Sequence, residues 1–429
     1  MALVLALALP ALALPALASA VGPISIPLER KVAPLGDISK TYYVGHLLVG
    51  SAPQRLQVGF ETASGSLVLD STRCNSPACL HHRRYAESAG AQHLNRAGGV
   101  VRTSEQAALS VDYNEDGPAS GVVVGDMMRD TVCLAEGLCA EVGFLAAKNM
   151  TDDPFLAPGQ SRGSSRPKKK QALESWSSPG ALPVDGLVGL SLEGLSISRT
   201  FNFLSCWTHL PQRFALFLPA QGPGEITFGG YKSSRALSKI SYVPVEDPQQ
   251  GFWQVRVKAV YVGNDSLDFC NGGCRAILDS SSSHITVPTE VLPLMQQKLT
   301  VKAAKGWLSE QPLCERAQGP SLTFELEGVN VTLDAKDYSA LEGHRCVPQL
   351  HPWDVEERQS TATRREGERV VTAGVHLKSL ILGEPLLRKY YTIFDAQPQP
   401  RVGFAEAREL SDEIILMQSS LSHKTAEEL

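Results

Sequence analysis

Short apolar runs, broken by glycine, proline and small polar residues, dominate the chain between Tyr42 and Ala405. A turn such as the Ser-Ala-Pro at 51–53 separates one run from the next. This pattern predicts short β-strands. Helical spacing is scarce, and it predicts short helices only at 288–299, which opens at a proline, and at 384–389. The chain is therefore expected to be mostly β.

Two stretches share one design, in which an apolar strand is followed by an acidic residue and then by small hydroxylic residues. The first is Phe-Glu-Thr-Ala-Ser at 60–64, and the second is Leu-Asp-Ser-Ser-Ser-Ser at 278–283. Each is followed, later in its own half, by an apolar strand that contains glycine, at 184–190 and 380–387. Glycine lets another backbone segment approach closely beside a site. The same order of elements occurs twice, which indicates an internal repeat at domain scale.

This repeat suggests a chemical role for the two acids. Glu61 and Asp279, one from each half, are expected to meet across a pseudo-twofold axis and to share a proton and a water.

The composition is that of a globular protein. The 429 residues are 43% hydrophobic and 20% charged, enough to bury one large or two medium cores. These values exclude collagen-like, coiled-coil and wholly disordered chains. The formal net charge of -5 is mild, so neither nucleic acid nor an anionic membrane is expected as a partner.

The first residues have the composition of a secretory signal peptide. Residues 1–20 are nearly all Ala, Leu, Val and Pro, and they end in Ala18-Ser19-Ala20, the small residues that signal peptidase accepts. Pro10 and Pro15 argue against a membrane anchor, and no later segment is apolar enough to cross a bilayer. We expect no membrane span after signal removal, and a location in the secretory pathway, either secreted or in an acidic endomembrane compartment.

The cysteines fit an oxidising compartment. Spacing groups eight of the nine into four disulfides and leaves Cys206 over; the pairs are Cys74 with Cys79, Cys133 with Cys139, Cys270 with Cys274, and Cys314 with Cys346. The two histidines after Cys79, at 81 and 82, also allow a metal-site interpretation. Adjacent histidine side chains diverge, so the disulfide loop is favoured and no metal is predicted. Sequons at Asn149, Asn264 and Asn330 fit a glycoprotein.

Residues 109–123 are expected to form a hairpin whose turn begins at Tyr113. Tyr113 is either an aromatic packed at a strand end or part of a flap that closes over a cleft. Two polar insertions are expected, at 148–181 and 354–368. The first carries a basic run at 166–170, which behind a signal peptide indicates a solvated loop rather than a nucleic-acid patch.

Together these motifs closely resemble the pepsin family of aspartic endopeptidases. The family's first active-site strand is Phe-Asp-Thr-Gly-Ser, where this chain has 60–64, and its second is Asp-Thr-Gly-Thr/Ser-Ser, where this chain has 279–283. The family's two small disulfide loops match Cys74 with Cys79 and Cys270 with Cys274, and its third, longer one matches Cys314 with Cys346. The flap tyrosine matches Tyr113, and the glycine strands match Gly186 and Gly383.

The resemblance implies a bilobal acid protease fold, with two β-barrel-like lobes related by a pseudo-twofold axis and a cleft between them for a polypeptide. It implies an N-terminal lobe at 41–240, a C-terminal lobe at 241–408, a tail at 409–429 and a short segment or prosegment remnant at 21–40. It also implies a monomer that needs no cofactor.

In the family, one carboxylate is ionised and takes a proton from the attacking water, while the protonated one hydrogen-bonds the carbonyl oxygen. Like charges this close cannot both ionise easily, so such pairs work in acid. Support for Glu61 and Asp279 is expected from four hydroxyls, those of Thr62, Ser64, Ser280 and Ser282.

The chain departs from the family at the acids themselves. Glu61 replaces Asp and is one methylene longer, and Ala63 and Ser281 replace two glycines, whose places a β-carbon is expected to crowd. Val68 replaces a Trp that commonly holds the flap tyrosine, and 21–40 is shorter than the family's inhibitory prosegments. We therefore expect a weak or inactive endopeptidase. The alternatives are a non-catalytic peptide- or protein-binding protein and a structural secretory protein with an idle cleft.

Overall fold

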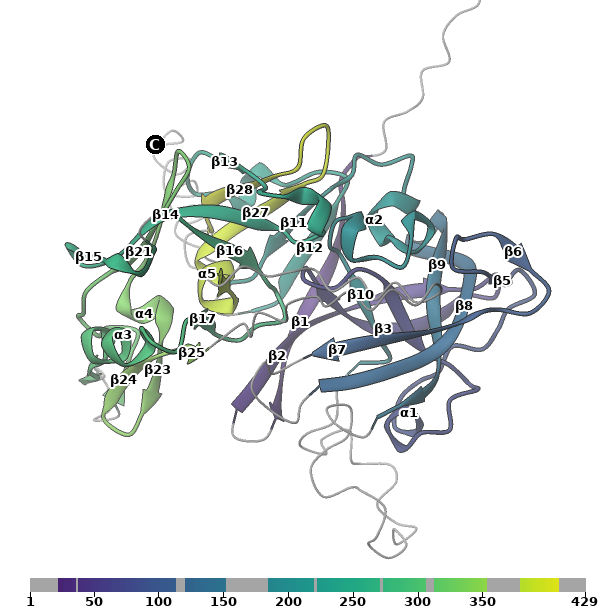
Figure 1. Cartoon of the computed structure of the whole chain (residues 1–429), viewed down its shortest axis with the longest axis horizontal. Coiled ribbons are helices and arrows are strands. Elements are labelled where there is room, and N and C mark those ends of the chain that lie inside the picture. The colour runs from purple at the N-terminus through teal and green to yellow at the C-terminus, as the bar shows by residue number, and fades with distance from the viewer. Residues whose placement is uncertain are drawn as a thin grey trace, which may run out of the picture.

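The computed structural model describes residues 22–35, 38–112, 120–151, 184–219, 222–270, 273–305, 312–352 and 379–408. The strands of the two chain halves lie on opposite sides of the molecule (Figure 1). Among the described residues, a 15-stranded sheet holds the N-terminal half together with β13, β27 and β28, and an eight-stranded sheet holds most of the rest. The prediction of a mostly β, bilobal fold is confirmed.

The first half contributes β1 (Ile24–Leu35), β2 (Ile38–Val49), β3 (Gln54–Glu61), β4 (Leu67–Asp70), β5 (Gln92–Leu94), β6 (Val100–Val101), β7 (Gln106–Asp112), β8 (Ser120–Ala135), β9 (Leu138–Met150), β10 (Gly186–Gly189), β11 (Arg213–Phe217) and β12 (Gly224–Phe228). The second contributes β13 (Ser241–Pro244), β14 (Gln254–Val262), β15 (Asp265–Leu267), β16 (Cys274–Leu278), β17 (Ile285–Val287), β18 (Val301–Lys302), β19 (Ala304–Lys305), β20 (Pro312–Leu313), β21 (Leu322–Leu326), β22 (Asn330–Leu333), β23 (Ser339–Glu342), β24 (Arg345–Pro348), β25 (Leu350–Pro352), β26 (Ser379–Leu382), β27 (Tyr390–Asp395) and β28 (Arg401–Glu406).

The described α-helices are all short: α1 (Pro77–Leu80), α2 (Phe203–Cys206), α3 (Leu292–Leu299), α4 (Ala335–Tyr338) and α5 (Glu384–Lys389). The helix predicted at 384–389 is confirmed. The one predicted at 288–299 begins later, at Leu292, because Val291 N donates to Pro288 O and closes a turn before the helix.

Two other sequence expectations are corrected at their boundaries. The insertion expected from residue 148 begins later, because Asn149 and Met150 still pair with β8 at the end of β9. Residues 24–35 form strand β1, whose pattern is interrupted by Pro27 and Pro34, and β1 pairs first with β12 and then with β2. The predicted signal peptide, the basic run, the 354–368 insertion and the C-terminal tail lie outside the described residues.

The internal repeat is confirmed by the strand pairing. In the first half β10 is parallel to β3 and antiparallel to β4, which is parallel to β9. In the second half β26 is parallel to β16 and antiparallel to β17, which is parallel to β25. A β-carbon at Gly186 would lie 2.4 Å from Val68 O, and one at Gly383 would lie 2.3 Å from Ser282 O. The predicted close backbone approach at both glycines is therefore confirmed.

One hydrophobic core continues from one half into the other. Phe214 of β11 stacks on Phe394 of β27 with ring centroids 4.6 Å apart, and Trp253 packs against both rings in a T-shaped arrangement. Trp253 Nε1 also donates to Leu190 O at 2.8 Å. Burial of large aromatic surface and a satisfied indole N–H fix the two halves relative to each other.

A reciprocal set of hydrogen bonds joins the halves beside the two acids. Thr62 Oγ1 donates to Leu278 O at 2.7 Å and accepts from Ser280 N at 3.0 Å. Ser280 Oγ donates to Phe60 O at 2.9 Å and accepts from Thr62 N at 3.2 Å. All four bonds are buried, so they hold the end of β3 against the end of β16. We call this set the Thr62–Ser280 clasp.

Buried acids also lie at the end of β4 and the start of β10. Burial and the nearby charge of Asp185 raise the pKa of Asp70, and Arg84 lowers it by less. The pKa of Asp70 therefore lies well above its usual range. Asp70 is 4% exposed. An acid whose pKa is raised by folding stabilises the protein fully below its unfolded pKa, and this contribution is lost as the pH rises through the folded pKa.

The clasp predicts a specific loss of stability. Ser280→Ala removes the hydroxyl that serves Phe60 O and Thr62 N, so it should lower the free energy of unfolding by about 1–3 kcal/mol in chemical denaturation. Ser64→Ala is the matched control, because Ser64 Oγ has no hydrogen-bond partner within the described ranges. Equal effects of the two substitutions would contradict the clasp.

The buried carboxyl group of Asp70 predicts that its neutralisation stabilises the protein. Asp70→Asn should raise the free energy of unfolding at pH 7, because a neutral amide avoids ionising a buried group. The gain should be about 1.4 kcal/mol for each pH unit between the unfolded and folded pKa values of Asp70. The gain should vanish near pH 4. Asp126→Asn is the control: Asp126 is equally buried but ion-paired with Arg73 at 2.9 Å, so this change should destabilise. Loss of stability in Asp70→Asn would overturn the prediction.

Candidate active site

The two acids occupy equivalent places in the repeat. Glu61 is the last residue of β3, and Leu190 N donates to its carbonyl at 2.8 Å. Asp279 directly follows β16, and its N–H donates to Leu382 O at 3.2 Å. Each acid is adjacent in sequence to one residue of the Thr62–Ser280 clasp. The structure therefore brings together the two motifs that the sequence singled out.

Asp279 is held by its own turn. Ser281 donates to Asp279 Oδ1 twice, from its backbone N and from Oγ, both at 2.8 Å. The expectation that the β-carbon of Ser281 crowds this approach is wrong, because the N–H still faces the carboxylate and the side chain adds a donor. Neither Ser281 nor Ala63 has a positive φ, so the loss of the two glycines causes no backbone strain there.

The hydroxyls expected outside the clasp have other roles. Ser282 Oγ donates to His284 O at 3.1 Å. Ser64 Oγ is buried and makes no hydrogen bond to any described residue. The hydroxyls of Thr62 and Ser280 thus belong to the clasp, whereas the hydroxyl of Ser282 bonds elsewhere. The backbone N–H of Ser282 donates to Asp279 O at 3.3 Å.

Tyr42 is a neighbour of Glu61 that the sequence did not single out. The antiparallel β2–β3 ladder ends at the pair Val44 and Gly59, and Tyr42 and Glu61 each lie two residues beyond that pair on their own strand. Tyr42 is 3% exposed and Glu61 4%. Burial and the charge of Glu61 raise the pKa of Tyr42 well above its usual value, so the phenol stays protonated beside the carboxylate. Pairing the predicted strands β2 and β3 in the sequence would have shown that Tyr42 lies near Glu61, because alternate residues of paired strands share one face of a sheet.

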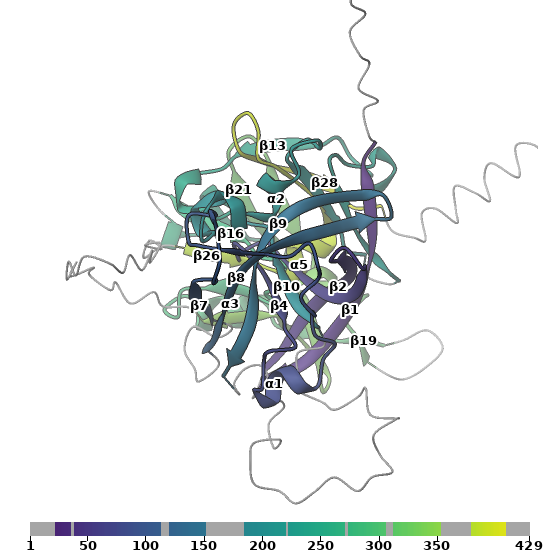
Figure 2. The ribbon, with the colours of Figure 1, turned by 90° about the vertical axis from the view of Figure 1, so that its right-hand side faces the viewer.

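The predicted hairpin is present as the antiparallel strands β7 and β8. Their pairing runs from Gln106 opposite Asp126 to Asp112 opposite Ser120. Strand β8 continues into the long β8–β9 hairpin (Figure 2). Tyr113 lies outside the described residues. Val68 is buried in a cluster with Tyr42 and Leu187, where it contributes an apolar side chain and no donor.

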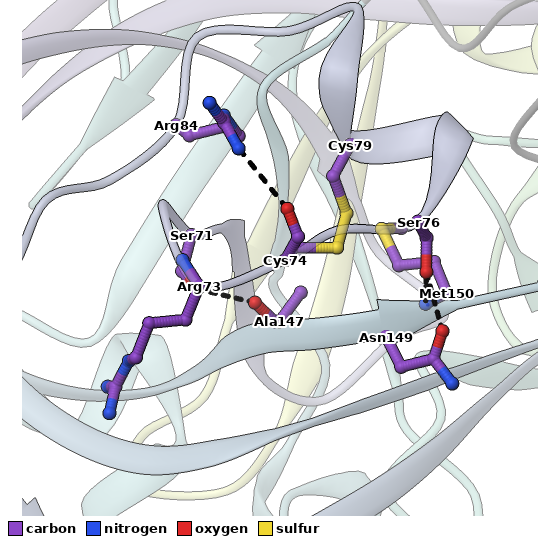
Figure 3. Close-up of a disulfide and its surroundings, with 9 residues drawn as sticks. All are labelled: Ser71, Arg73, Cys74, Ser76, Cys79, Arg84, Ala147, Asn149 and Met150. Carbon is purple, nitrogen blue, oxygen red and sulfur yellow. Dashed lines mark hydrogen bonds between the residues drawn. A yellow bond between two sulfur atoms is a disulfide. The ribbon is translucent and has the colours of Figure 1, made fainter.

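The predicted disulfides are confirmed in all four pairs, and Cys206 keeps a thiol that donates to Thr200 O. Figure 3 shows Cys74–Cys79, where Arg84 donates to Cys74 O and Ser76 Oγ donates to Asn149 Oδ1. Both sulfurs are consumed by the disulfide, so this loop is not a thiolate metal site. Within the described residues, no cluster of His, Cys, Asp and Glu could hold a metal ion, and no helix is long and apolar enough to span a membrane.

Comparison with known proteins gives one family. A family model described as eukaryotic aspartyl protease matches residues 42–407. Cathepsin E of Oryctolagus cuniculus is 27% identical over 384 residues, covering 87% of this chain and 82% of its own. Gastricsin of Homo sapiens is 26% identical over 393 residues, covering 87% and 85%. Since the match spans both acid motifs and both halves of the fold, the chain belongs to the eukaryotic aspartyl protease family.

Proposed function

We propose that this protein binds an extended polypeptide between its lobes and hydrolyses it, through Glu61 and Asp279, far more slowly than a site built from two aspartates. The observation that carries the proposal is the location of Glu61 at the end of β3, next to an intact Thr62–Ser280 clasp. The frame that aligns the acids is retained, and the first acid is altered.

The chemistry requires a water held between two carboxyl groups. One carboxylate accepts a proton from the water as it attacks the peptide carbonyl, and the protonated partner donates to the carbonyl oxygen. The extra methylene of Glu61 shifts its carboxyl group by about 1 Å relative to an aspartate, and a displacement of that size can lower a rate by about 100-fold. Ser281 fixes Asp279 Oδ1, so the defect is assigned to the first half of the pair.

A second candidate function is peptide or protein binding without turnover. Glu61 is 4% exposed, and its charge acts on the equally buried phenol of Tyr42. This arrangement favours a cleft in which a chain is held but the water is misplaced. The third possibility, an idle cleft, predicts no peptide binding.

We further propose that the protein is a glycosylated member of the secretory pathway and acts as a monomer. Support comes from the four disulfides, the signal-like residues 1–20, and the exposed side chains of Asn149, Asn264 and Asn330.

The proposed function predicts little cleavage of a denatured globular substrate between about pH 3 and 6, where paired carboxyls share a proton. Peptide release should be about 100-fold or more below that of a two-aspartate family member assayed in parallel. Asp279→Ala should abolish what remains while a fluorescent peptide still binds. Rapid turnover that is lost in Asp279→Ala would refute weak catalysis, and absent peptide binding would favour the idle cleft.

A further inference from the structure

The carboxylate of Glu384 is buried between the two halves of the chain. Glu384 begins α5 in the second half and is 2% exposed, yet its side-chain hydrogen bonds come from β1 and β2 of the first half. Arg30 Nη2 donates to Oε2 at 3.0 Å and Arg30 Nε donates to Oε1. Thr41 Oγ1 donates to Oε2 at 3.0 Å, and Tyr43 OH donates to Oε1 at 2.6 Å. Each carboxylate oxygen therefore accepts two hydrogen bonds.

The same residues bond to the turn that carries Asp279. Glu384 N donates to Ser282 O at 2.8 Å, and Thr41 N donates to Ser283 Oγ at 2.7 Å. The turn is thus attached to α5 on one side and to β2 on the other. A shift of Glu384 would be transmitted to Asp279 through two residues of backbone.

Strand β1, which supplies Arg30, precedes the region matched by the family model. That match begins at residue 42, whereas β1 spans Ile24–Leu35. The strand pairs with β12 over Ile24–Leu28 and with β2 from Glu29 onward, so it forms part of the central sheet. Removing it would take away both the sheet pairing and the guanidinium that neutralises Glu384.

We propose that Arg30, Thr41, Tyr43 and Glu384 form an inter-lobe clamp that positions the Asp279 turn. The physical reason is the cost of a buried charge. A carboxylate with a bidentate guanidinium partner is tolerated in the interior, but the same carboxylate without it is strongly destabilising. The clamp does not depend on turnover, so it can hold even where the proposed function fails.

The charges around Glu384 set the pH range of the clamp. Arg30 and Tyr43 face it from β1 and β2, Arg388 lies on α5, and His284 lies on the turn. Burial raises the pKa of Glu384, but the hydrogen bonds and charge of Arg30, with smaller contributions from Tyr43 and Arg388, outweigh it and leave the pKa below its ordinary value. An acid whose pKa is lowered by folding stabilises the folded protein above its unfolded pKa. This contribution is lost only as the pH falls through the folded pKa. The clamp therefore persists in mild acid.

Hydrogen exchange of the full chain tests the clamp without an activity assay. In Arg30→Met at pH 7, the backbone amides of Ser280, Ser281 and Ser282 should exchange about 10-fold faster or more, because the turn opens locally. Amides of β21, away from the clamp, should not change. Lys31→Met is the matched control, since Lys31 sits next on β1 and pairs only at 3.6 Å with Glu29, whose side chain is 67% exposed. Equal exchange in Arg30→Met and Lys31→Met would overturn the proposal.

A second variant separates the buried charge from loss of packing. Arg30→Met combined with Glu384→Gln removes the uncompensated carboxylate, so turn exchange at pH 7 should be slower than in Arg30→Met alone. The excess exchange of Arg30→Met should also shrink at pH 5, where the unpaired Glu384 takes up a proton. If Arg30→Met does not fold while the double variant and Lys31→Met do, the clamp is supported equally. If the turn amides of the double variant exchange as fast at pH 7 as those of Arg30→Met, the clamp is contradicted.

Discussion

The Thr62–Ser280 clasp is the constraint on which the candidate site depends. Each hydroxyl donates to the backbone of the opposite half and accepts a backbone N–H in return, so four buried polar groups are satisfied by two side chains. Two acids that come from strands 218 residues apart can be aligned only if the strand ends are fixed to each other. The clasp provides that fixed point, and both Glu61 and Asp279 are its immediate neighbours.

Around the clasp the two halves repeat one topology but are secured differently. In the first half, the carbonyl of Leu190, which follows Gly189, accepts from the indole of Trp253. In the second half, the residue after Gly383 is Glu384, whose side chain bonds to β1 and β2. Each half is thus held by a group from the other half, once by a neutral hydrogen bond and once by a charged cluster.

Much of this could be predicted from the sequence because the informative residues are local. The acid-hydroxyl turns, the glycine strands and the cysteine spacings each constrain a short segment, and the two halves repeat them. The clamp could not be predicted, since Arg30 and Glu384 are 354 residues apart and nothing in either segment indicates its partner. Strand β1 was missed because Pro27 and Pro34 interrupt its apolar pattern, although its pairing accommodates both. Ser281 differed from expectation because its N–H, not the absence of a β-carbon, is what Asp279 needs.

The central claim is that the frame of an aspartic protease is intact while its first acid is displaced. The most direct measurement is kcat/KM of the double variant Glu61→Asp with Ala63→Gly on a denatured protein substrate in mild acid. We expect a rise in kcat/KM of about 100-fold or more over the natural chain, with no activity when Asp279→Ala is added. An unchanged kcat/KM in a folded double variant would contradict the claim, because the defect would then lie outside Glu61 and Ala63.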